Sequence, residues 1–479
     1  MRILDSIRTV SIYSLLFIVN ILIIPTTIYT FMRNGGNDYI NNNSIILSVL
    51  IALINLCIIS DAKKNNNCLL LILSIWTLLF YLLRIITLNL TEFSNVFNRS
   101  DANFGDVNFA LIIVIISTSV IWHALHFKKT HNRNYTLECC ISSKILTKAL
   151  ILFWISLIIE IAAELNIPFI GPIASILNSF FLRPISICFL LLIFFYCNKD
   201  KMPKKYWYLL ILSVVVFVLY RTLAGSRSGI YIILKMVLFI ILVLGVRRIN
   251  TNIVLMGVFL LPIMLFFFIF TTYMRKIGMS DGSLSEKIAI AQLVLNNDTD
   301  IDPVMAMSEV YDRIGFLDFS VEMIKNKDHF RNVINLKNEV KSIVDNALSP
   351  GFDVFDQARM SHLVDKSYVY ESNIPKSKFI TLDYQSDELT LYGELFVLFF
   401  LPINFIFLFL IGYVFKKVWL SKKIQVKELD LARKAICLAL FEIALSSYGL
   451  DWLVLDIISY YISYKIFQIV CIKLKPVTI

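Results

Sequence analysis

The chain has 479 residues, of which 58% are hydrophobic and 17% are charged, and its formal net charge at pH 7 is +10. Soluble domains are closer to half apolar and a quarter charged. This composition excludes an ordinary soluble protein and indicates that lipid is the solvent for much of the chain.

Apolar runs long enough to cross a bilayer follow one another along almost the whole sequence. About 18 to 24 helical residues, each rising 1.5 Å, cover roughly 30 Å of hydrocarbon. We therefore expect an all-α polytopic membrane protein with about twelve transmembrane helices. The predicted spans are 9–31, 44–60, 68–90, 107–127, 145–163, 181–197, 207–223, 229–245, 253–273, 391–415, 431–447 and 452–470.

Basic residues flank alternate ends of these runs. Arg2 and Arg8 precede the first run, Lys63 and Lys64 follow the second, and further basic clusters recur at every second connection. Lys and Arg are retained on the cytoplasmic side during insertion. We expect a multi-pass protein of the bacterial inner membrane with both termini cytoplasmic. Anionic lipid head groups account for the positive excess, so no nucleic-acid partner is needed.

A long polar stretch interrupts the apolar pattern. It divides the chain into nine predicted spans at 1–273, the polar stretch at 274–390 on the extracytoplasmic side, and three further spans at 391–479. Loops of this length are usually functional. Apolar positions recur at helical spacing within 284–295 and 303–324. We expect short amphipathic helices resting on the membrane face, and a small separate domain is the alternative.

A turn rich in glycine and serine joins the seventh predicted span to the eighth at the outer face. It reads Arg221-Thr-Leu-Ala-Gly225-Ser226-Arg227-Ser228-Gly229. The eighth helix would start here, so its free N–H groups and positive dipole end would face outward. The arginines add planar groups that match phosphate oxygens. The pattern predicts a site for a lipid-linked phosphate, and the alternative is a simple turn whose arginines reach head groups.

Several ionisable residues fall within or at the ends of predicted spans: Arg84, Glu160, Glu164, Arg183, Lys235, Glu442, Asp451 and Asp456. Each costs about 2.5 to 3.5 kcal/mol at a helix centre, so they either pair or line a wet cavity. For any single residue we favour pairing. Glu160 and Glu164 are one turn apart and repel unless a cation separates them, and Arg183 is the expected cation.

Glu394 follows the polar stretch and opens the predicted span 391–415. A carboxylate one turn into a membrane helix is a candidate for function, and the alternative is stabilisation by the helix N-terminus. The sequence has no nucleotide-binding glycine loop of the Walker type and no paired Cys or His at metal-ligand spacing. We therefore expect no metal and no cofactor.

Three short motifs on this chain of about a dozen helices resemble the Wzy-type O-antigen and oligosaccharide-repeat polymerases. They are Gly225-Ser226-Arg227-Ser228-Gly229, Tyr311-Asp312-Arg313-Ile314-Gly315 and Tyr392-Gly393-Glu394. The resemblance covers most of residues 200–415. It implies an architecture similar to the C-type glycosyltransferases, with one large extracytoplasmic loop of short helices. It also implies a metal-independent enzyme acting at the outer face of the inner membrane on undecaprenyl-diphosphate-linked oligosaccharides.

The reaction implied by this resemblance moves the growing glycan from undecaprenyl diphosphate to a hydroxyl of the incoming repeat unit. The residues implied for it are Arg227, Arg313 and Arg221 as the clamp on the departing diphosphate, the turn Gly225, Ser226, Ser228 and Gly229 as its binding site, Glu394 as general base, and His362 and Asp387 in reserve. Membrane lipid, a chain-length regulator and a flippase are the implied partners. Some family members carry an Arg and a Gly at fixed spacing in two outer loops, and this sequence lacks that pair.

Three other functions remain open from the sequence. An O-antigen ligase shares the lipid donor and the large late loop, but that family usually carries a His-Asn pair in the loop. Here His131-Asn132 falls in a predicted cytoplasmic connection. A flippase or secondary transporter would use the charges within the membrane as a pathway, although its loops are usually short. A non-enzymatic membrane scaffold fits the arginines and carboxylates on the outer face less well.

Overall fold

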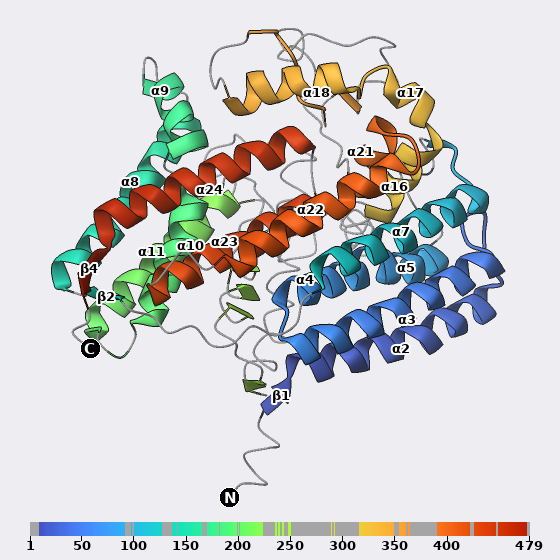
Figure 1. Ribbon diagram of the computed structural model, residues 1–479, viewed down its shortest axis with the longest axis horizontal. Helices are drawn as coiled ribbons and strands as arrows, with labels where there is room; N and C mark the ends of the chain where they lie inside the picture. The colour runs from blue at the N-terminus through green and yellow to red at the C-terminus, as the bar shows by residue number, and fades with distance from the viewer. Residues whose placement is uncertain are drawn as a thin grey trace, which may run out of the picture.

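The computed structural model is a bundle of α-helices with short antiparallel strand pairs at one end (Figure 1). It describes residues 9–91, 97, 100–126, 137–140, 142–164, 170–181, 183–198, 200, 202–223, 235–236, 238–239, 242–243, 248–250, 289, 292, 316–348, 354–360, 363–364, 390–421, 426–446 and 449–476.

The described elements follow the chain in this order. The helices up to residue 223 are α2 (Ile12–Asn34), α3 (Asn42–Asn65), α4 (Cys68–Thr77), α5 (Leu83–Thr91), α7 (Phe104–Leu125), α8 (Ser143–Glu164), α9 (Ile170–Ile176), α10 (Pro184–Cys197) and α11 (Lys204–Leu223). The later helices are α16 (Phe316–Lys325), α17 (Lys327–Arg331), α18 (Leu336–Ile343), α21 (Leu391–Leu398), α22 (Ile403–Leu420), α23 (Lys427–Leu445) and α24 (Leu450–Cys471). The π-helical segments are η1 (Leu78–Leu82), η2 (Leu177–Phe181) and η4 (Val344–Leu348), and the strands are β1 (Thr9–Ser11), β2 (Leu137–Cys140), β3 (Arg248–Asn250) and β4 (Lys473–Pro476).

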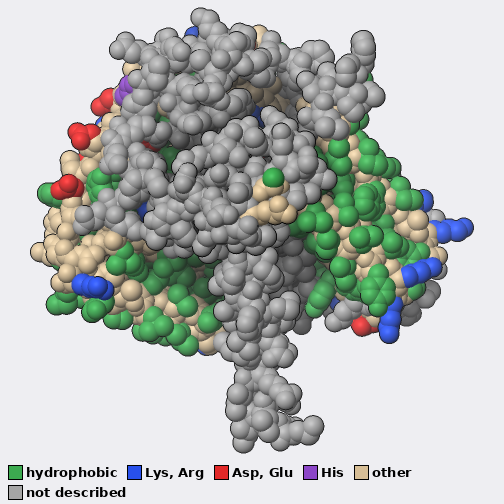
Figure 2. Space-filling model, turned by 180° about the vertical axis from the view of Figure 1, so that it is seen from behind, with side chains coloured by type: hydrophobic (Ala, Val, Ile, Leu, Met, Phe, Trp, Pro, Cys, Tyr) green, Lys and Arg blue, Asp and Glu red, His purple; other side chains and the backbone are tan. Residues whose placement is uncertain are grey.

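Among the described residues, seven helical stretches are long and apolar enough to cross a membrane. They are Ile12–Asn34, Asn42–Asn65, Cys68–Leu90, Phe104–Leu125, Ser143–Ala163, Ile403–Leu420 and Leu450–Cys471. Each overlaps a predicted span, so the expectation of a polytopic membrane protein is confirmed. Figure 2 shows hydrophobic side chains gathered over both flanks of the molecule, as contact with lipid requires. The predicted span 253–273 and most of 229–245 lie outside the described residues.

Polar caps set the ends of several long helices. The side chain of Asn41 accepts the N–H of Ser44, and the side chain of Ser44 accepts the N–H of Asn41 in return. Asn103 and Asp106 make the same reciprocal pair at the start of α7. Such caps satisfy N–H groups that the first helical turn leaves free. The caps therefore define where α3 and α7 begin. Helix α3 packs against both α2 and α7.

Pairings between distant segments place the helix connections at two opposite ends of the bundle. Strand β1 pairs with β3, and β2 pairs with β4. The basic-residue pattern assigns all four of these segments to one side of the membrane. At the other end, the N–H of Phe104 donates to the carbonyl of Asp38 at 2.8 Å, and Lys325 pairs with Asp106 at 3.3 Å. In Figure 1, α16, α17 and α18 lie along the edge opposite both strand pairs.

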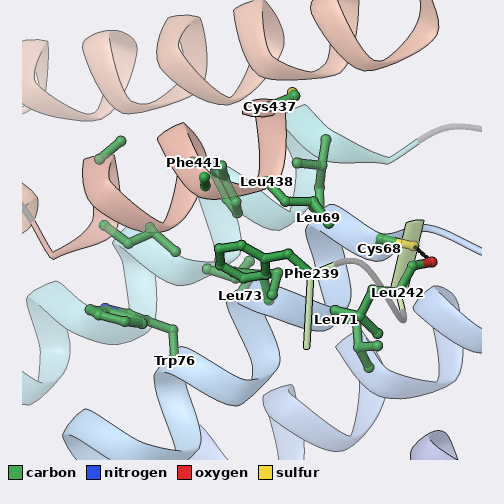
Figure 3. Close-up of a cluster of buried hydrophobic side chains, with 14 of the residues drawn as sticks. Cys68, Leu69, Leu71, Leu73, Trp76, Phe239, Leu242, Cys437, Leu438 and Phe441 are labelled. Carbon is green, nitrogen blue, oxygen red and sulfur yellow. Dashed lines mark hydrogen bonds between the residues drawn. The ribbon is translucent and has the colours of Figure 1, made fainter. Parts of the chain in front are cut away.

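The apolar core joins the two halves of the bundle where α4 meets α23 (Figure 3). Leu69 of α4 and Phe441 of α23 are buried on either side of this contact, and the ring of Phe239 lies between the two helices. The thiol of Cys68 donates to the carbonyl of Leu242 at 3.3 Å. The described residues of the predicted span 229–245 are therefore part of the central core.

Helix α16 of the polar stretch is built into the bundle. It packs against α7 and α21, and every residue except its last is buried. Nε of Arg84, on α5, donates to Asp318 of α16 at 3.0 Å, and both side chains are buried. A charge pair with several hydrogen bonds is the form in which ions tolerate burial. The prediction that this amphipathic helix rests on the membrane face is wrong, because Asp318 binds an arginine of the third span.

The predicted span 391–415 consists of two helices. Helix α21 ends at Leu398, Phe399 is extended, and α22 begins after Pro402. Proline has no N–H with which to continue a helix. Glu394 therefore lies in a short helix outside the candidate span Ile403–Leu420, which corrects its predicted position one turn inside a membrane helix.

Replacing Asp318 by alanine should destabilise the protein by about 3–5 kcal/mol, because it leaves the buried Arg84 without its carboxylate. Thermal unfolding of the purified full chain in mild detergent measures the loss. Asp328→Ala is the matched control, since the Asp328–Arg331 pair is exposed and is worth about 0–1 kcal/mol. The double variant Arg84→Leu/Asp318→Leu should recover most of the loss. Equal melting temperatures for Asp318→Ala and the control would contradict this role.

Candidate functional site

The N-terminus of α24 collects three buried carboxyl groups. The N–H of Leu450 donates to Glu394 at 3.1 Å, and the N–H of Trp452 donates to Asp451 at 2.8 Å. Glu339 is buried beside them, and the charges of Glu394 and Asp451 act on it. These N–H groups lack partners within the helix and carry the positive end of its dipole, so they favour anions. Glu339, Glu394 and Asp451 are called the acidic cluster below.

The Tyr392-Gly393-Glu394 motif fixes the position of one of these carboxyl groups. The ring of Tyr392 stacks on that of Tyr81, with 5.9 Å between the centroids. A Cβ atom on Gly393 would lie 2.9 Å from the Cβ of Met323 in α16, closer than packed carbon atoms approach. The aromatic stack holds α21 against η1, the missing side chain lets α21 pack closely on α16, and Glu394 on this helix meets the N–H of Leu450 in α24.

Helix α18 carries Glu339, the third member of the cluster, and η4 continues from it. Both pack against α24. The hydroxyl of Ser342 donates to Asp451 at 2.7 Å. Asp345 accepts the N–H groups of Val354 and Gln357 at 3.0 and 2.8 Å, which holds residues 354–357 beside η4. The polar stretch therefore reaches α24 through specific hydrogen bonds.

The acidic cluster binds protons tightly. Burial raises the pKa of Glu394 to about 8, the hydrogen bond from Leu450 opposes this rise, and the charge of Asp451 adds to it. Burial, followed by the charges of Glu394 and Asp451, raises the pKa of Glu339 well above its ordinary value. One carboxylate oxygen of Glu394 and both carboxylate oxygens of Glu339 have no hydrogen-bond partner among the described residues. At neutral pH the cluster therefore holds at least one proton.

Arg359 connects the acidic cluster to further charges. Its guanidinium lies over the ring of Trp452, 3.7 Å from the centroid, in the arrangement that favours a cation on an aromatic face. Its charge acts on both Asp451 and Arg183. A cation therefore lies between the carboxyl groups at the start of α24 and the ion pairs along the same helix.

Ion pairs between helices extend this region through the bundle. Arg183 pairs with Asp456 of α24, and Arg221 at the end of α11 pairs with Glu160 of α8. The charges of Arg221 and Glu160 also act on Arg183. An unbroken sequence of charge interactions thus joins Glu394 to Arg221. We call it the charged series, and its members are Glu339, Glu394, Asp451, Arg359, Arg183, Asp456, Arg221 and Glu160.

The expectation that charges within the spans pair with one another is confirmed for these residues, but the predicted partner of Glu160 is revised. Glu160 pairs with Arg221, while Arg183 pairs with Asp456 and acts on Glu160 as a neighbouring charge. Helix α10 packs against both α8 and α24, so Arg183 at its start is near carboxylates of both helices, while α11 packs against α8 and brings Arg221 to Glu160. A single sequence does not reveal which helices are neighbours.

Of the residues predicted to form the site, the structure describes Arg221 and Glu394, and it joins them through the charged series. The other predicted positions lie outside the described residues: Gly225, Ser226, Arg227, Ser228, Gly229, Arg313, His362 and Asp387. Glu339 and Arg359 belong to the site but were not singled out by the sequence, since both occur among many charges of the polar stretch. Within the described residues, no group of three or more His, Cys, Asp or Glu side chains could hold a metal ion.

No protein-family model, curated protein or solved structure matches the chain.

Glu394 should make the protein less stable as the pH rises from about 5 to about 8. Its pKa is about 8 in the folded chain and 4.5 as an isolated group, so the folded chain binds the proton more tightly. This contribution is complete below the lower pKa and is lost as the pH passes the higher one. Glu394→Gln cannot titrate at this position. The melting temperature of the variant minus that of wild type should therefore become more positive as the pH rises from 5 to 8.5.

Melting curves of the detergent-purified chain at several pH values test this expectation. Asp328→Asn is the control, because its exposed carboxyl group lies outside the acidic cluster. A wild-type pH dependence that is unchanged in Glu394→Gln would show that Glu394 does not carry the shifted proton.

Proposed function

We propose that this chain is a membrane glycosyltransferase that polymerises lipid-linked oligosaccharide repeat units, as in O-antigen synthesis. The observation that carries the proposal is the charged series. It links three arginines to the protonatable acidic cluster that forms where the polar stretch packs on α24, in a chain that is otherwise strongly apolar. Charges held within a membrane protein are costly and are usually kept for function.

In the proposed reaction, a hydroxyl of the incoming repeat unit attacks the anomeric carbon of the glycan on undecaprenyl diphosphate. A new glycosidic C–O bond forms, and the bond from the anomeric carbon to the diphosphate oxygen breaks. The leaving diphosphate takes the electron pair, and the hydroxyl proton passes to a carboxylate. Preorganised cations in a partly dehydrated site stabilise the departing charge. Arg183, Arg221 and Arg359 are suited to this task, with Arg227 and Arg313 added by the sequence motifs.

Glu394 is the proposed general base. A carboxylate whose pKa is about 8 accepts a proton far more readily than an ordinary one once it is ionised. General-base assistance of this kind is worth about 10² to 10⁴ in rate. Its hydrogen bond to the N–H of Leu450 keeps the ionised form oriented. His362 and Asp387 remain reserve candidates from the sequence.

The proposed architecture has twelve spans, resembles the C-type glycosyltransferases, and has both termini in the cytoplasm of the bacterial inner membrane. Beyond the seven candidate spans, α10, α11 and α23 coincide with predicted spans, and 229–245 and 253–273 complete the set. The pairing of β1 with β3 and of β2 with β4 supports this topology, because paired strands must lie on one side of the membrane. The basic residues give that side as cytoplasmic.

A second candidate is a flippase for the same lipid-linked oligosaccharides. The observation that favours it is the buried acidic cluster, since protonatable carboxyl groups within membrane proteins commonly couple proton movement to transport. An O-antigen ligase is the third candidate. The three activities differ in the surface polysaccharide that remains when the protein is lost.

A deletion strain of the source bacterium, complemented with variants, tests the proposal. Wild type should restore a ladder of surface polysaccharide. Glu394→Gln removes the base, and Arg359→Lys keeps the charge but loses the planar stack on Trp452, so each should reduce polymer at least tenfold. Asp328→Asn is the control and should behave as wild type. Membrane levels of each variant are measured by blot.

A single repeat unit on the lipid A core in the deletion strain and in the two site variants supports a polymerase. Loss of every repeat, with lipid-linked material accumulating, indicates a ligase or a flippase and contradicts the proposal. Full-length ladders in well-expressed Glu394→Gln would remove Glu394 from the mechanism.

A further inference from the structure

Helices α22, α23 and α24 form an apolar groove of about 830 Å³ on the outside of the bundle. Helix α23 packs against both of the others. Leu410 and Val414 of α22 line one side and Ile457 and Tyr461 of α24 line the other, and all four side chains are exposed in the isolated chain. In a bilayer this groove faces hydrocarbon, so a lipid chain is the natural class of occupant.

One end of the groove is cationic. Arg433 and Lys465 line it there, at the end remote from the acidic cluster. Arg433 donates to the carbonyl of Trp419 at 3.3 Å and to Asp430, which fixes its guanidinium beside the groove. Its Nε–H has no hydrogen-bond partner among the described residues. This N–H is buried, so Arg433 acts on a ligand at this end of the groove through its positive charge.

Lys465 adds a second positive charge. Its ammonium lies 5.7 Å from the centroid of the Tyr461 ring, and the side chain is exposed. Asp430 offsets only part of the local charge, because Lys434 also pairs with it, at 3.0 Å. The cationic end is therefore complementary to an anion such as a phosphate diester.

The length of the groove identifies the kind of chain that fits. From Phe407 to Val418 it follows α22 for about 16 Å at 1.5 Å per residue. One leaflet contributes half of the roughly 30 Å of hydrocarbon, so the groove is about one leaflet deep on this side. A phospholipid acyl chain has this reach, whereas the polyprenyl tail of the proposed donor is much longer.

We propose that this groove binds one acyl chain of an anionic glycerophospholipid, whose head-group phosphate is held by Arg433 and Lys465. The cationic end lies where α22 and α24 finish, at the end of the bundle that carries the strand pairs. The basic-residue pattern assigns that end to the cytoplasm, where the leaflet is rich in anionic lipid. The site is independent of glycosyl transfer, so either proposal can fail without the other.

Native mass spectrometry of the detergent-purified full chain tests the site, with phosphatidylglycerol and phosphatidylcholine of the same chains as probes. Wild type should retain one phosphatidylglycerol in preference to phosphatidylcholine. Lys465→Gln should lower that retention about fivefold, since one basic side chain near an anionic surface is worth about 1 kcal/mol. Ile457→Trp fills the groove and should abolish retention of both lipids. Lys417→Gln is the matched control, because Lys417 is at the same end of α22 but does not line the groove.

Three outcomes would overturn the proposal. Equal retention of the two phospholipids would show that the cationic end does not select the head group. Preferential retention of undecaprenyl phosphate would assign the groove to the proposed donor. A dimer that survives delipidation and is lost in Ile457→Trp would assign it to a second copy of the chain. If Ile457→Trp fails to fold, the comparison of Lys465→Gln with Lys417→Gln still decides, because neither changes the apolar wall.

Discussion

Charges that leave water must find partners, and this constraint orders the described bundle. The pairs join helices that are far apart in the sequence: Arg84 with Asp318, Arg183 with Asp456, Arg221 with Glu160, and Lys235 with Glu442. Each pair restricts how two helices can pack, because sliding either helix would expose an unpaired charge to hydrocarbon. The acidic cluster meets the same constraint differently. Three carboxyl groups share one helix N-terminus, and proton binding removes the charge that the helix dipole does not stabilise.

The apolar runs of the sequence predicted where most described helices lie, because crossing a bilayer fixes both their length and their composition. The third span, predicted at 68–90, is found at Cys68–Leu90. The break before α22 was missed, since Phe399, Phe400 and Leu401 continue the apolar run that Pro402 interrupts. The embedding of α16 was missed for another reason. An amphipathic pattern is the same whether the apolar face meets lipid or protein, and only the distant Arg84 decides between them.

The site was predictable only in part. Glu394 was found because a carboxyl group beside a membrane span is costly, and the structure supplies its compensation from another helix, the N-terminus of α24. Arg221 was expected to face a phosphate and is also the partner of Glu160. Glu339 and Arg359 could not be singled out, because what distinguishes them is burial and a neighbouring ring rather than any local pattern. Partner choice follows from helix packing, which a single sequence does not show.

The pairing of Arg84 with Asp318 also affects how the protein is made. The two residues are 234 positions apart, and ribosomes add about 5 to 20 residues per second. The third span therefore enters the bilayer roughly 10 to 50 s before its counter-ion has been synthesised. During that interval the guanidinium must reach toward the interface for water or lipid phosphate. A nascent chain that stalls before residue 318 thus carries an unanchored central helix, the kind of defect that membrane quality-control proteases recognise.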